Sequence, residues 1–298
     1  MRILLTGGAG NGKSTFARQL ATQLPSPRYY VLTGSEDGAE TAVDRQRARE
    51  LRQTEAMQVL RCCEAPWQVP VSDAGVLVVD CLCHLTARAM FDVPGGMDDV
   101  PQRVLVQVQA LEQKCEHLIV ITNEVGSGCG RYTDETPRYI KALGQLNRAL
   151  AQRFDCVCEL VSGIPNVVKG SLPVSPAYSE PDWDLLLVIG GSGAGKQDYV
   201  RQLGWQDWQM SADPWSNCPV LTDLQDLTEP VSPRLLEQLR TKRVIICDEV
   251  GSGVIPVEES AREGRIRTGS LCVRLARHAK QVVRLLCGIP VVLKENDG

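Results

Sequence analysis

The feature that most constrains the fold is an apolar run joined to a glycine-rich loop at the start of the chain. Residues 1–6 are short and apolar, and they lead directly into Gly7-Gly-Ala-Gly-Asn-Gly-Lys-Ser14. This string is a Gly-x-x-x-x-Gly-Lys-Ser phosphate-binding loop. Phe16, Leu20 and Leu24 then follow at helical spacing. The order strand, loop, helix predicts a P-loop nucleotide-binding fold, whereas a chance glycine-rich turn would lack the correct flanks.

Each residue type in this loop suits a triphosphate. Glycines let the backbone N–H groups turn toward phosphate oxygens, and the positive end of the next helix dipole faces the same anion. Lys13 adds a charge for the β and γ phosphates, and the Ser14 hydroxyl is a ligand for Mg²⁺. The residues predicted to bind nucleotide here are Gly7, Gly8, Ala9, Gly10, Asn11, Gly12, Lys13, Ser14 and Thr15.

Further short runs rich in β-branched residues are separated by helical patterns. They are expected as strands at residues 29–33, 76–80, 118–122 and 157–161. Such a pattern predicts a mostly parallel sheet with helices on both faces. Asp80 ends one of these strands, where P-loop enzymes keep the acid that positions magnesium. The alternative for Asp80 is a helix N-cap or a turn residue.

The composition and the apolar runs of the chain argue against a nucleic-acid partner and against a membrane span. A hydrophobic content of 43% is enough for a buried core, while a net charge of −4 and 5% aromatic residues argue against binding nucleic acid. The apolar run at the N-terminus is too short for a signal peptide, and no stretch is long enough to span a membrane. The twelve cysteines show no paired Cys-x-x-Cys spacing, so we expect reduced, buried thiols in a cytoplasmic protein.

The second half of the chain repeats the first. A proline-rich stretch, residues 171–182, reads as a linker, and a second apolar run then enters a second glycine loop, Gly190–Gln197. Glu-Val-Gly-Ser-Gly occurs at 124–128 and again at 249–253, and Gly-Ile-Pro occurs at 163–165 and at 288–290. Both repeats have the same offset. We therefore expect tandem copies, with residues 1–170 as a complete domain, 171–183 as a linker and 184–298 as a shortened copy.

The second copy has lost part of the chemistry. Gln197 stands where Ser14 stood, and an amide is a poor ligand for Mg²⁺ in that turn. If Asp223 is the counterpart of Asp80, the loop lysine and this aspartate are 27 residues apart in the second copy and 67 residues apart in the first. The second loop therefore either binds nucleotide weakly or only supports the first copy.

Several motifs together resemble a known family. They are the loop at 7–14, Val-Asp-Cys-Leu at 79–82, Asn-Glu-Val-Gly-Ser-Gly at 123–128 and Ser-Gly-Ile-Pro at 162–165. This set resembles adenosylcobinamide kinase/adenosylcobinamide-phosphate guanylyltransferase, and the second half resembles it through Asp-Glu-Val-Gly-Ser-Gly at 248–253. The resemblance implies a RecA-like P-loop fold and oligomers, although a tandem copy could fill one such contact within the chain.

The same resemblance implies a reaction and further site residues. The reaction is phosphorylation of the aminopropanol hydroxyl of cobinamide by ATP or GTP with Mg²⁺. The implied nucleotide contacts include Thr33 and Glu64, and the implied acid is Asp80. Lys13 and Mg²⁺ would neutralise the transferred group, and Asp80 or Glu124 would accept or orient the proton of the attacking hydroxyl. Glu124 as a turn residue is the alternative.

One departure concerns the second reaction of that family. Members that transfer guanylyl groups carry a nucleophilic histidine, but residues 44–52 here contain arginines and no histidine. Arginine has no free lone pair at neutral pH and cannot replace it. The arginines either clamp a phosphate or form a solvated helix face.

The three histidines of the chain offer no clear substitute. His84 is close enough to Asp80 in sequence to be a weak candidate, although a structural helix histidine is the preferred interpretation. His117 and His278 are expected at helix ends, where a cation suits the dipole.

Three hypotheses follow. The leading one is a corrinoid kinase that acts on a small molecule. A second keeps both reactions with another nucleophile or direct transfer, and a third is a non-catalytic nucleotide-binding regulator or scaffold. Retention of Lys13, Ser14 and Asp80 argues against complete loss of catalysis.

Overall fold

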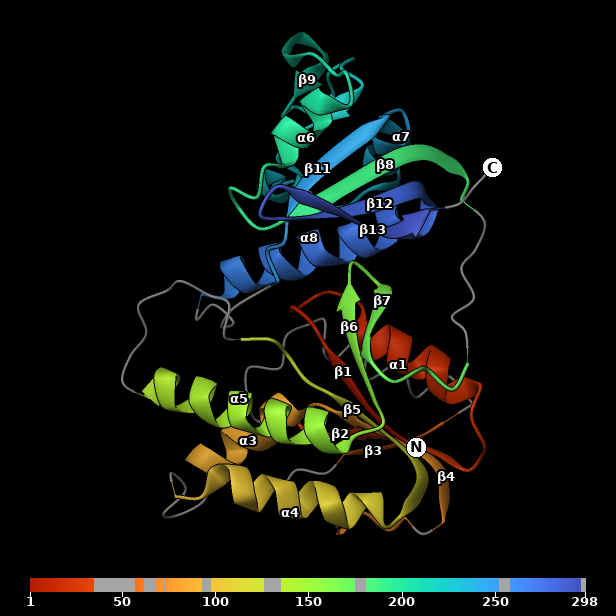
Figure 1. Cartoon of the computed structure of the whole chain (residues 1–298), viewed down its shortest axis with the longest axis vertical. Helices are drawn as coiled ribbons and strands as arrows, with labels where there is room; N and C mark the ends of the chain where they lie inside the picture. Colours follow the sequence, from red (N-terminus) through yellow and green to blue (C-terminus); the bar gives the residue numbers. More distant parts are fainter. Residues whose placement is uncertain are drawn as a thin grey trace. The chain divides into compact units, whose positions relative to one another are not determined.

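The chain forms two compact units, each with one sheet (Figure 1). The structure is a computed structural model that describes residues 1–34, 57–61, 68–71, 73–92, 98–125, 135–174, 181–251 and 258–295. The first unit comprises Met1–Gly7, Lys13–Glu159 and Val167–Pro176. The second comprises Gly8–Gly12, Leu160–Asn166 and Ala177–Gly298. The phosphate loop and the turn at Leu160–Asn166 thus group with the second half of the chain.

The first sheet has seven strands in the order β3-β2-β4-β5-β1-β6-β7. β1 lies between β5 and β6 and pairs with both in parallel. The strands β4 and β5 are apolar on both faces, as expected for a parallel sheet with helices on each side. The bounds of the strands are β1 Arg2–Thr6, β2 Arg28–Leu32, β3 Gln58–Arg61, β4 Ala74–Asp80, β5 Cys115–Ile121, β6 Cys156–Val161 and β7 Ile164–Lys169.

Four described helices cover this sheet. α1 (Lys13–Thr22) packs on one face, and α3 (Leu82–Phe91), α4 (Val100–Glu112) and α5 (Glu135–Arg153) pack against one another on the opposite face (Figure 1). The mostly parallel α/β fold predicted from the sequence is confirmed. The five strands expected in the first copy are all present, with bounds that shift by one to three residues.

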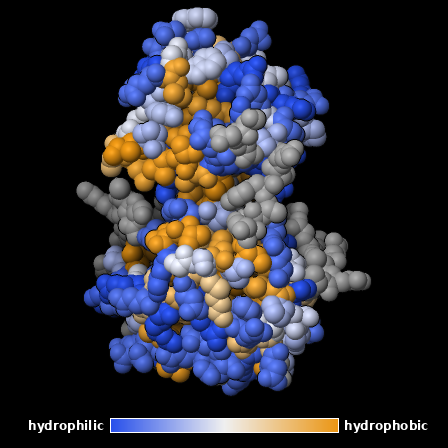
Figure 2. All heavy atoms as spheres, turned by 45° about the vertical axis from the view of Figure 1, so that its right-hand side comes forward, coloured by the Kyte–Doolittle hydropathy of each residue, from blue (hydrophilic) through white to orange (hydrophobic). Residues whose placement is uncertain are grey.

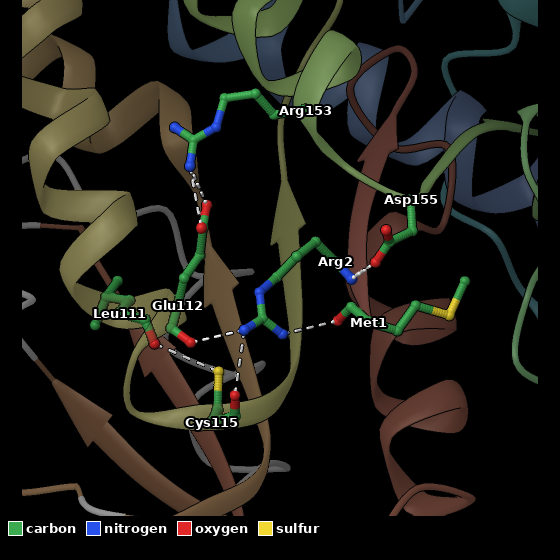
Figure 3. Close-up of polar contacts among 7 residues, drawn as sticks. All are labelled: Met1, Arg2, Leu111, Glu112, Cys115, Arg153 and Asp155. Carbon is green, nitrogen blue, oxygen red and sulfur yellow. Dashed lines mark hydrogen bonds and ion pairs between the residues drawn. The ribbon is translucent and has the colours of Figure 1, made fainter.

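An arginine ties the amino ends of the strands to the helix layer (Figure 3). The Arg2 guanidinium donates to the carbonyl oxygens of Glu112 at 2.7 Å and Glu116 at 2.8 Å, which lie where α4 ends and β5 begins. Its own backbone N–H donates to the Asp155 carboxylate at 2.6 Å. A cation at the carboxyl end of a helix satisfies carbonyls that lack an intrahelical partner. This end of the sheet is therefore structural, and the opposite end carries the glycine loop.

The second unit holds six strands in the order β13-β12-β8-β11-β10-β9. Its described helices are α6 (Lys196–Gln202), α7 (Pro233–Arg240) and α8 (Glu259–His278), with short 3-10 turns at Asp207–Gln209 and Leu224–Asp226. The strands are β8 Trp183–Gly190, β9 Met210–Ser211, β10 Val220–Leu221, β11 Val244–Asp248, β12 Ala279–Leu286 and β13 Ile289–Glu295. The proposed linker, residues 171–183, follows β7 and overlaps β8 at Trp183.

The two sheets share strand order and register, as a duplication predicts. Leu4 pairs with Val157 in the first sheet, and the corresponding Leu187 pairs with Val282 in the second. In the same way β4 corresponds to β10, because Val78 pairs with Ile119 and Val220 pairs with Val244. No described strand of the second sheet corresponds to β3, which agrees with the shortened second copy.

This register corrects one expectation. If Val220 corresponds to Val78, the residue at the place of Asp80 is Thr222. Asp223 lies one residue farther and has a left-handed backbone, with φ 55°. The second copy therefore has a neutral hydroxyl where the first has a carboxylate.

A second correction concerns His117. It lies within β5, where it pairs with Val76 in the parallel ladder, and not at a helix end. The helix α4 ends at Glu112 and β5 begins at Cys115, so His117 follows the helix end by five residues. His278 is the last residue of α8, as expected. Within the described ranges, no helix is both long and apolar enough to cross a bilayer.

Candidate functional site

The glycine loop has the backbone geometry that its sequence predicts. Gly7, Gly10 and Gly12 have φ values of 132°, 78° and 81°, which L residues with a side chain rarely adopt. α1 begins at Lys13, so the loop ends at a helix N-terminus. The first backbone N–H groups of a helix have no partner within it and can bind an anion.

Lys13 and Ser14, the loop residues predicted to bind phosphate and Mg²⁺, are nearly buried. Lys13 is 6% exposed, and its Nζ donates to the Gly7 carbonyl at 2.9 Å. Ser14 is 8% exposed in the first turn of α1. Thr15 instead accepts a hydrogen bond from the Arg18 guanidinium at 3.3 Å. The amine and the Ser14 hydroxyl are thus held at the loop, while Thr15 faces its own helix.

Asp80 is held at the end of β4 by Tyr30 of the neighbouring strand β2 and by Thr33, which follows that strand. The buried Tyr30 hydroxyl donates to Asp80 Oδ2 at 2.6 Å, and the Thr33 N–H donates to the Asp80 carbonyl at 2.9 Å. The Thr33 hydroxyl is fully buried; it donates to the Cys81 carbonyl at 2.8 Å and accepts from the Cys81 N–H at 2.7 Å. Thr33 therefore holds the strand end, and its contact with nucleotide stays a prediction.

Glu124 lies on the other side of the loop. Its backbone N–H donates to the Gly7 carbonyl at 3.3 Å, and its side chain is exposed. β4, β5 and β1 are neighbours in the sheet, and Asp80, Glu124 and Gly7 follow their carboxyl ends in that order. Ligands of open α/β sheets bind at this edge. Asp80, Glu124 and the loop that leads to Lys13 therefore all follow the same edge of the sheet.

A cavity of about 390 Å³ opens beside Glu124, between α5 and the strands β1 and β6. Its walls are mostly apolar. The lining residues are Leu4, Thr6, Glu124, Val125, Ile140, Gly144, Asn147, Arg148, Ala151 and Val157.

The donor set at this edge fits a hard cation. Ser14 offers a hydroxyl oxygen and Asp80 a carboxylate oxygen, which are the ligand types that Mg²⁺ prefers. Tyr30 engages Oδ2 of Asp80, which leaves Oδ1 for a metal or its water. Within the described ranges, no cluster of three His, Cys, Asp or Glu residues is present. A site of the P-loop kind, in which phosphates complete the coordination, is therefore the arrangement that these residues can support.

Tyr30 was missed by sequence reasoning. It is fully buried in β2, and its bond to Asp80 crosses from one strand to the next. A hydrogen bond to a charged group contributes about 1.5–3 kcal/mol. The short apolar run at residues 29–33 predicts a strand, but nothing in the sequence marks the Tyr30 hydroxyl as a partner of Asp80.

We expect Tyr30→Phe to lower the rate of phosphoryl transfer about tenfold and the free energy of unfolding by about 1–2 kcal/mol, because Asp80 loses the donor that orients it. Steady-state kinetics and urea unfolding measure both. Tyr29→Phe on the same strand is the matched control, and equal effects of the two substitutions would exclude the positioning role.

The remaining sequence predictions have different outcomes. Glu64, the arginine-rich segment at 44–52 and the glycines of 126–128 lie outside the described residues. His84 is exposed on α3, with its ring 3.3 Å from the position that a Cβ on Gly34 would occupy. His278 stacks on Trp183 and hydrogen-bonds to Asp182, so it is a structural residue of the second unit.

The described cysteines are free thiols, and most are buried. A hydrogen bond with Cys81 and burial raise the pKa of the Cys83 thiol well above its usual range. Burial likewise raises the pKa of Cys115 to about 11. Thiolate is the nucleophilic form, so neither residue is suited to replace the absent histidine.

The second loop repeats the backbone of the first. Ala194 N–H donates to the Gly191 carbonyl as Asn11 does to Gly8, and Glu249 N–H donates to the Gly190 carbonyl as Glu124 does to Gly7. Gly193 and Gly195 also have positive φ. The loop shape has therefore been retained although Ser14 has been replaced by Gln197.

Two charged residues near the second loop, Lys196 and Glu249, form ion pairs within the second copy. Lys196 Nζ lies 2.5 Å from Asp248 Oδ1, and the position of Asp248 is held by neutral Asn123 in the first copy. Glu249 pairs with Arg284 at 2.9 Å, whereas the register places Glu159 at that position in the first sheet. The second loop lysine thus already has an internal counter-ion, which a phosphate would have to displace.

We expect Lys196→Met to lower the free energy of unfolding by about 2 kcal/mol, because it leaves the partly buried Asp248 without its cation. Urea unfolding measures the loss. The double variant Lys196→Met with Asp248→Asn should recover most of it, and a double variant as unstable as the single one would show that the ion pair is not the cause.

Comparisons with known proteins identify a family and related sequences. A family model described as cobinamide kinase / cobinamide phosphate guanyltransferase matches residues 3–168 and 220–293. The chain is similar to the bifunctional adenosylcobalamin biosynthesis protein CobP of Pseudomonas aeruginosa, with 28% identity over 173 residues that cover 57% of this chain and 98% of the relative. CobU of Escherichia coli, another bifunctional adenosylcobalamin biosynthesis protein, is 26% identical over 187 residues that cover 57% of this chain and 100% of the relative. Nearly the whole of each relative thus matches little more than half of this chain.

Proposed function

Because the chain belongs to the cobinamide kinase / cobinamide phosphate guanyltransferase family, we propose that its first copy phosphorylates the aminopropanol hydroxyl of adenosylcobinamide with ATP or GTP. The observation that supports this proposal is that Asp80, Glu124 and the glycine loop that leads to Lys13 follow the carboxyl ends of the neighbouring strands β4, β5 and β1. A loop lysine and two carboxylates around a helix N-terminus suit phosphoryl transfer, in which positioning and charge stabilisation supply most of the catalysis.

Each residue has a separate role in this proposal. Lys13 is held at the loop by the Gly7 carbonyl, and its charge would stabilise the negative oxygens of the transferred group. Asp80, oriented by Tyr30, and Ser14 would hold Mg²⁺, which would supply further neutralisation of the phosphates. Exposed Glu124 would accept or orient the proton of the attacking hydroxyl.

We propose that guanylyl transfer is lost or proceeds by another route. The family histidine is absent from residues 44–52, and the raised pKa of the Cys83 thiol disfavours that residue as a substitute. The alternative, a nucleotide-binding regulator, is favoured by one observation, the Lys196 to Asp248 ion pair in the second loop. A purely regulatory role does not explain why Asp80 and Glu124 are present beside the first loop.

Product analysis tests the proposal. Purified protein is incubated with adenosylcobinamide, Mg²⁺ and either ATP or GTP, and the corrinoids are examined by mass spectrometry. We expect adenosylcobinamide phosphate and no guanylylated product. Acid-labile GMP on the protein would establish guanylyl transfer, and nucleotide binding without any new corrinoid would support the regulator.

A further inference from the structure

Polar side chains inside the first unit hold the turn that carries Glu124. Hydrophilic side chains cover much of the visible surface of both units in Figure 2, whereas a polar side chain buried within a unit needs a reason. Thr122 is such a residue, because it is fully buried directly after β5 and two residues before Glu124. Its hydroxyl donates to Asn147 Oδ1 at 2.7 Å, and Asn147 lies half-buried on α5. We call Thr122 and Asn147 the polar pair.

The amide of Asn147 holds one particular peptide group. Its Nδ2 donates to the Asn123 carbonyl at 3.2 Å. The same peptide group contains the Glu124 N–H, which donates to the Gly7 carbonyl at 3.3 Å. Because a peptide group is planar, its carbonyl and its N–H turn together. Asn147 and Gly7 therefore fix both ends of the peptide group that carries Glu124.

The two members of the polar pair have distinct tasks. The Asn123 carbonyl can only accept, so it requires the Nδ2 end of the Asn147 amide. The Thr122 hydroxyl donates to the Oδ1 end and so keeps the amide in that orientation. From the opposite side, the Asn123 N–H donates to Cys83 Sγ at 3.2 Å. The residue before Glu124 is thus held by α3 and by α5.

The same hydrogen bonds reach the loop lysine. The Gly7 carbonyl accepts from the Glu124 N–H and also from Lys13 Nζ, at 2.9 Å. A carbonyl oxygen has two lone pairs and can accept both. The Asn147 amide is therefore connected to Lys13 through one peptide group and one carbonyl, and the positions of Glu124 and Lys13 depend on each other.

The second copy lacks the polar pair. At the 125-residue offset of the repeat, Cys247 stands at the place of Thr122 and Cys272 at the place of Asn147. The helices α5 and α8 end at this same offset, which supports the correspondence. Both cysteines belong to a buried apolar cluster of the second unit. A thiol is at most a weak donor and cannot replace the amide.

The turn itself is nevertheless retained in the second copy. The Glu249 N–H donates to the Gly190 carbonyl at 2.9 Å, and the Asp248 N–H donates to Gln225 Oε1 at 2.9 Å. The loop lysine of this copy, however, donates to the Gly191 carbonyl and not to that of Gly190. The turn therefore forms without the polar pair. The pair occurs in the copy that also keeps the loop serine, which points to a role in the reaction.

We propose that Thr122 and Asn147 are positioning residues for phosphoryl transfer. They fix the peptide group that carries Glu124, so that its carboxylate faces the attacking hydroxyl while the Gly7 carbonyl stays bound to Lys13. This inference rests on the proposed function, in which Glu124 accepts or orients the proton of that hydroxyl. The polar pair acts through Glu124 and does not itself bind the substrate.

The second copy supplies the variant that tests this proposal. Thr122→Cys combined with Asn147→Cys, the thiol variant, gives the first copy the two residues that the second copy has at these places. The second copy packs both thiols around the same turn, so the thiol variant should fold, and it is kept reduced. We expect its single-turnover rate of phosphorylation to fall about tenfold, because a reacting group is misplaced, while the Kd for nucleotide changes by less than about threefold.

A double-mutant cycle with Glu124→Gln separates positioning from a general structural effect. Glu124→Gln alone is expected to lower the rate about a hundredfold. In that background the thiol variant should lower the rate by less than about twofold further, because the group that it positions has already been removed. Equal losses in both backgrounds would overturn the positioning role alone. Full activity of Glu124→Gln would instead contradict the proposed function, and the positioning role with it.

Amide hydrogen exchange at Glu124 tests the contact without reference to activity. We expect exchange about fivefold faster in the thiol variant than in wild type, because the peptide group has lost one of its two hydrogen-bond partners. Lys169→Met is the control, since Lys169 Nζ donates to backbone carbonyls at the far end of α5. It should leave both the exchange at Glu124 and the rate unchanged. Unchanged exchange at Glu124 in the thiol variant would overturn the proposal even if the protein phosphorylates the corrinoid.

Discussion

Lys13→Ala is expected to lower the rate of cobinamide phosphorylation by about a thousandfold, the size of effect seen when one preorganised group that stabilises transition-state charge is removed. The ammonium group is nearly buried and held by the Gly7 carbonyl, so it costs little to reorganise when charge develops on the phosphate. Single-turnover assays with excess enzyme measure the chemical step.

The matched control for this prediction is Lys196→Met. It removes the equivalent lysine of the second loop, whose charge is already paired with Asp248. We expect it to change the rate less than threefold while it lowers stability. If Lys196→Met were as inactive as Lys13→Ala and still folded, the assignment of the reaction to the first copy would be wrong.

Asp80→Asn is expected to lower the rate about a hundredfold at limiting Mg²⁺ and to raise the concentration of Mg²⁺ that gives half-maximal activity. The amide can still accept from Tyr30 but has lost the negative charge that attracts the cation and its water. Rates measured across a Mg²⁺ titration, with EDTA as the zero point, give both quantities.

Asp92→Asn is the control for this substitution. Asp92 pairs with Arg88 at the exposed end of α3, so its loss removes a surface ion pair that contributes little. Full activity of Asp80→Asn at all Mg²⁺ concentrations would remove Asp80 from the metal site.

The local signals of the chain predicted the fold because they agree with one another. The loop at residues 7–14 specifies its own backbone through Gly10 and Gly12, and the apolar runs at 76–80 and 118–122 specify buried parallel strands. The location of the site can then be predicted, because the residues that follow parallel strands lie at one edge of the sheet. The grouping of Lys13, Asp80 and Glu124 was therefore accessible from sequence.

Features that depend on pairing between residues far apart in the chain could not be predicted from the sequence. Tyr30 meets Asp80 only because β2 and β4 pair in one register, and Thr222 replaces Asp223 as the counterpart of Asp80 for the same reason. The hairpins at 162–163 and 287–288 did carry a signal, a two-residue turn with glycine between apolar runs. The glycine of each turn opens the repeated Gly-Ile-Pro segment, which indicates the duplication but not the turn.

Equilibrium titration of purified protein with ATP and with GTP, counting nucleotides bound per chain, examines the first loop directly. We expect one site per chain, abolished by Lys13→Ala and retained in Lys196→Met, because Lys196 is already paired with Asp248, which a phosphate would have to displace. Two equal sites, or a single site that survives Lys13→Ala, would contradict the assignment of nucleotide binding to the first copy.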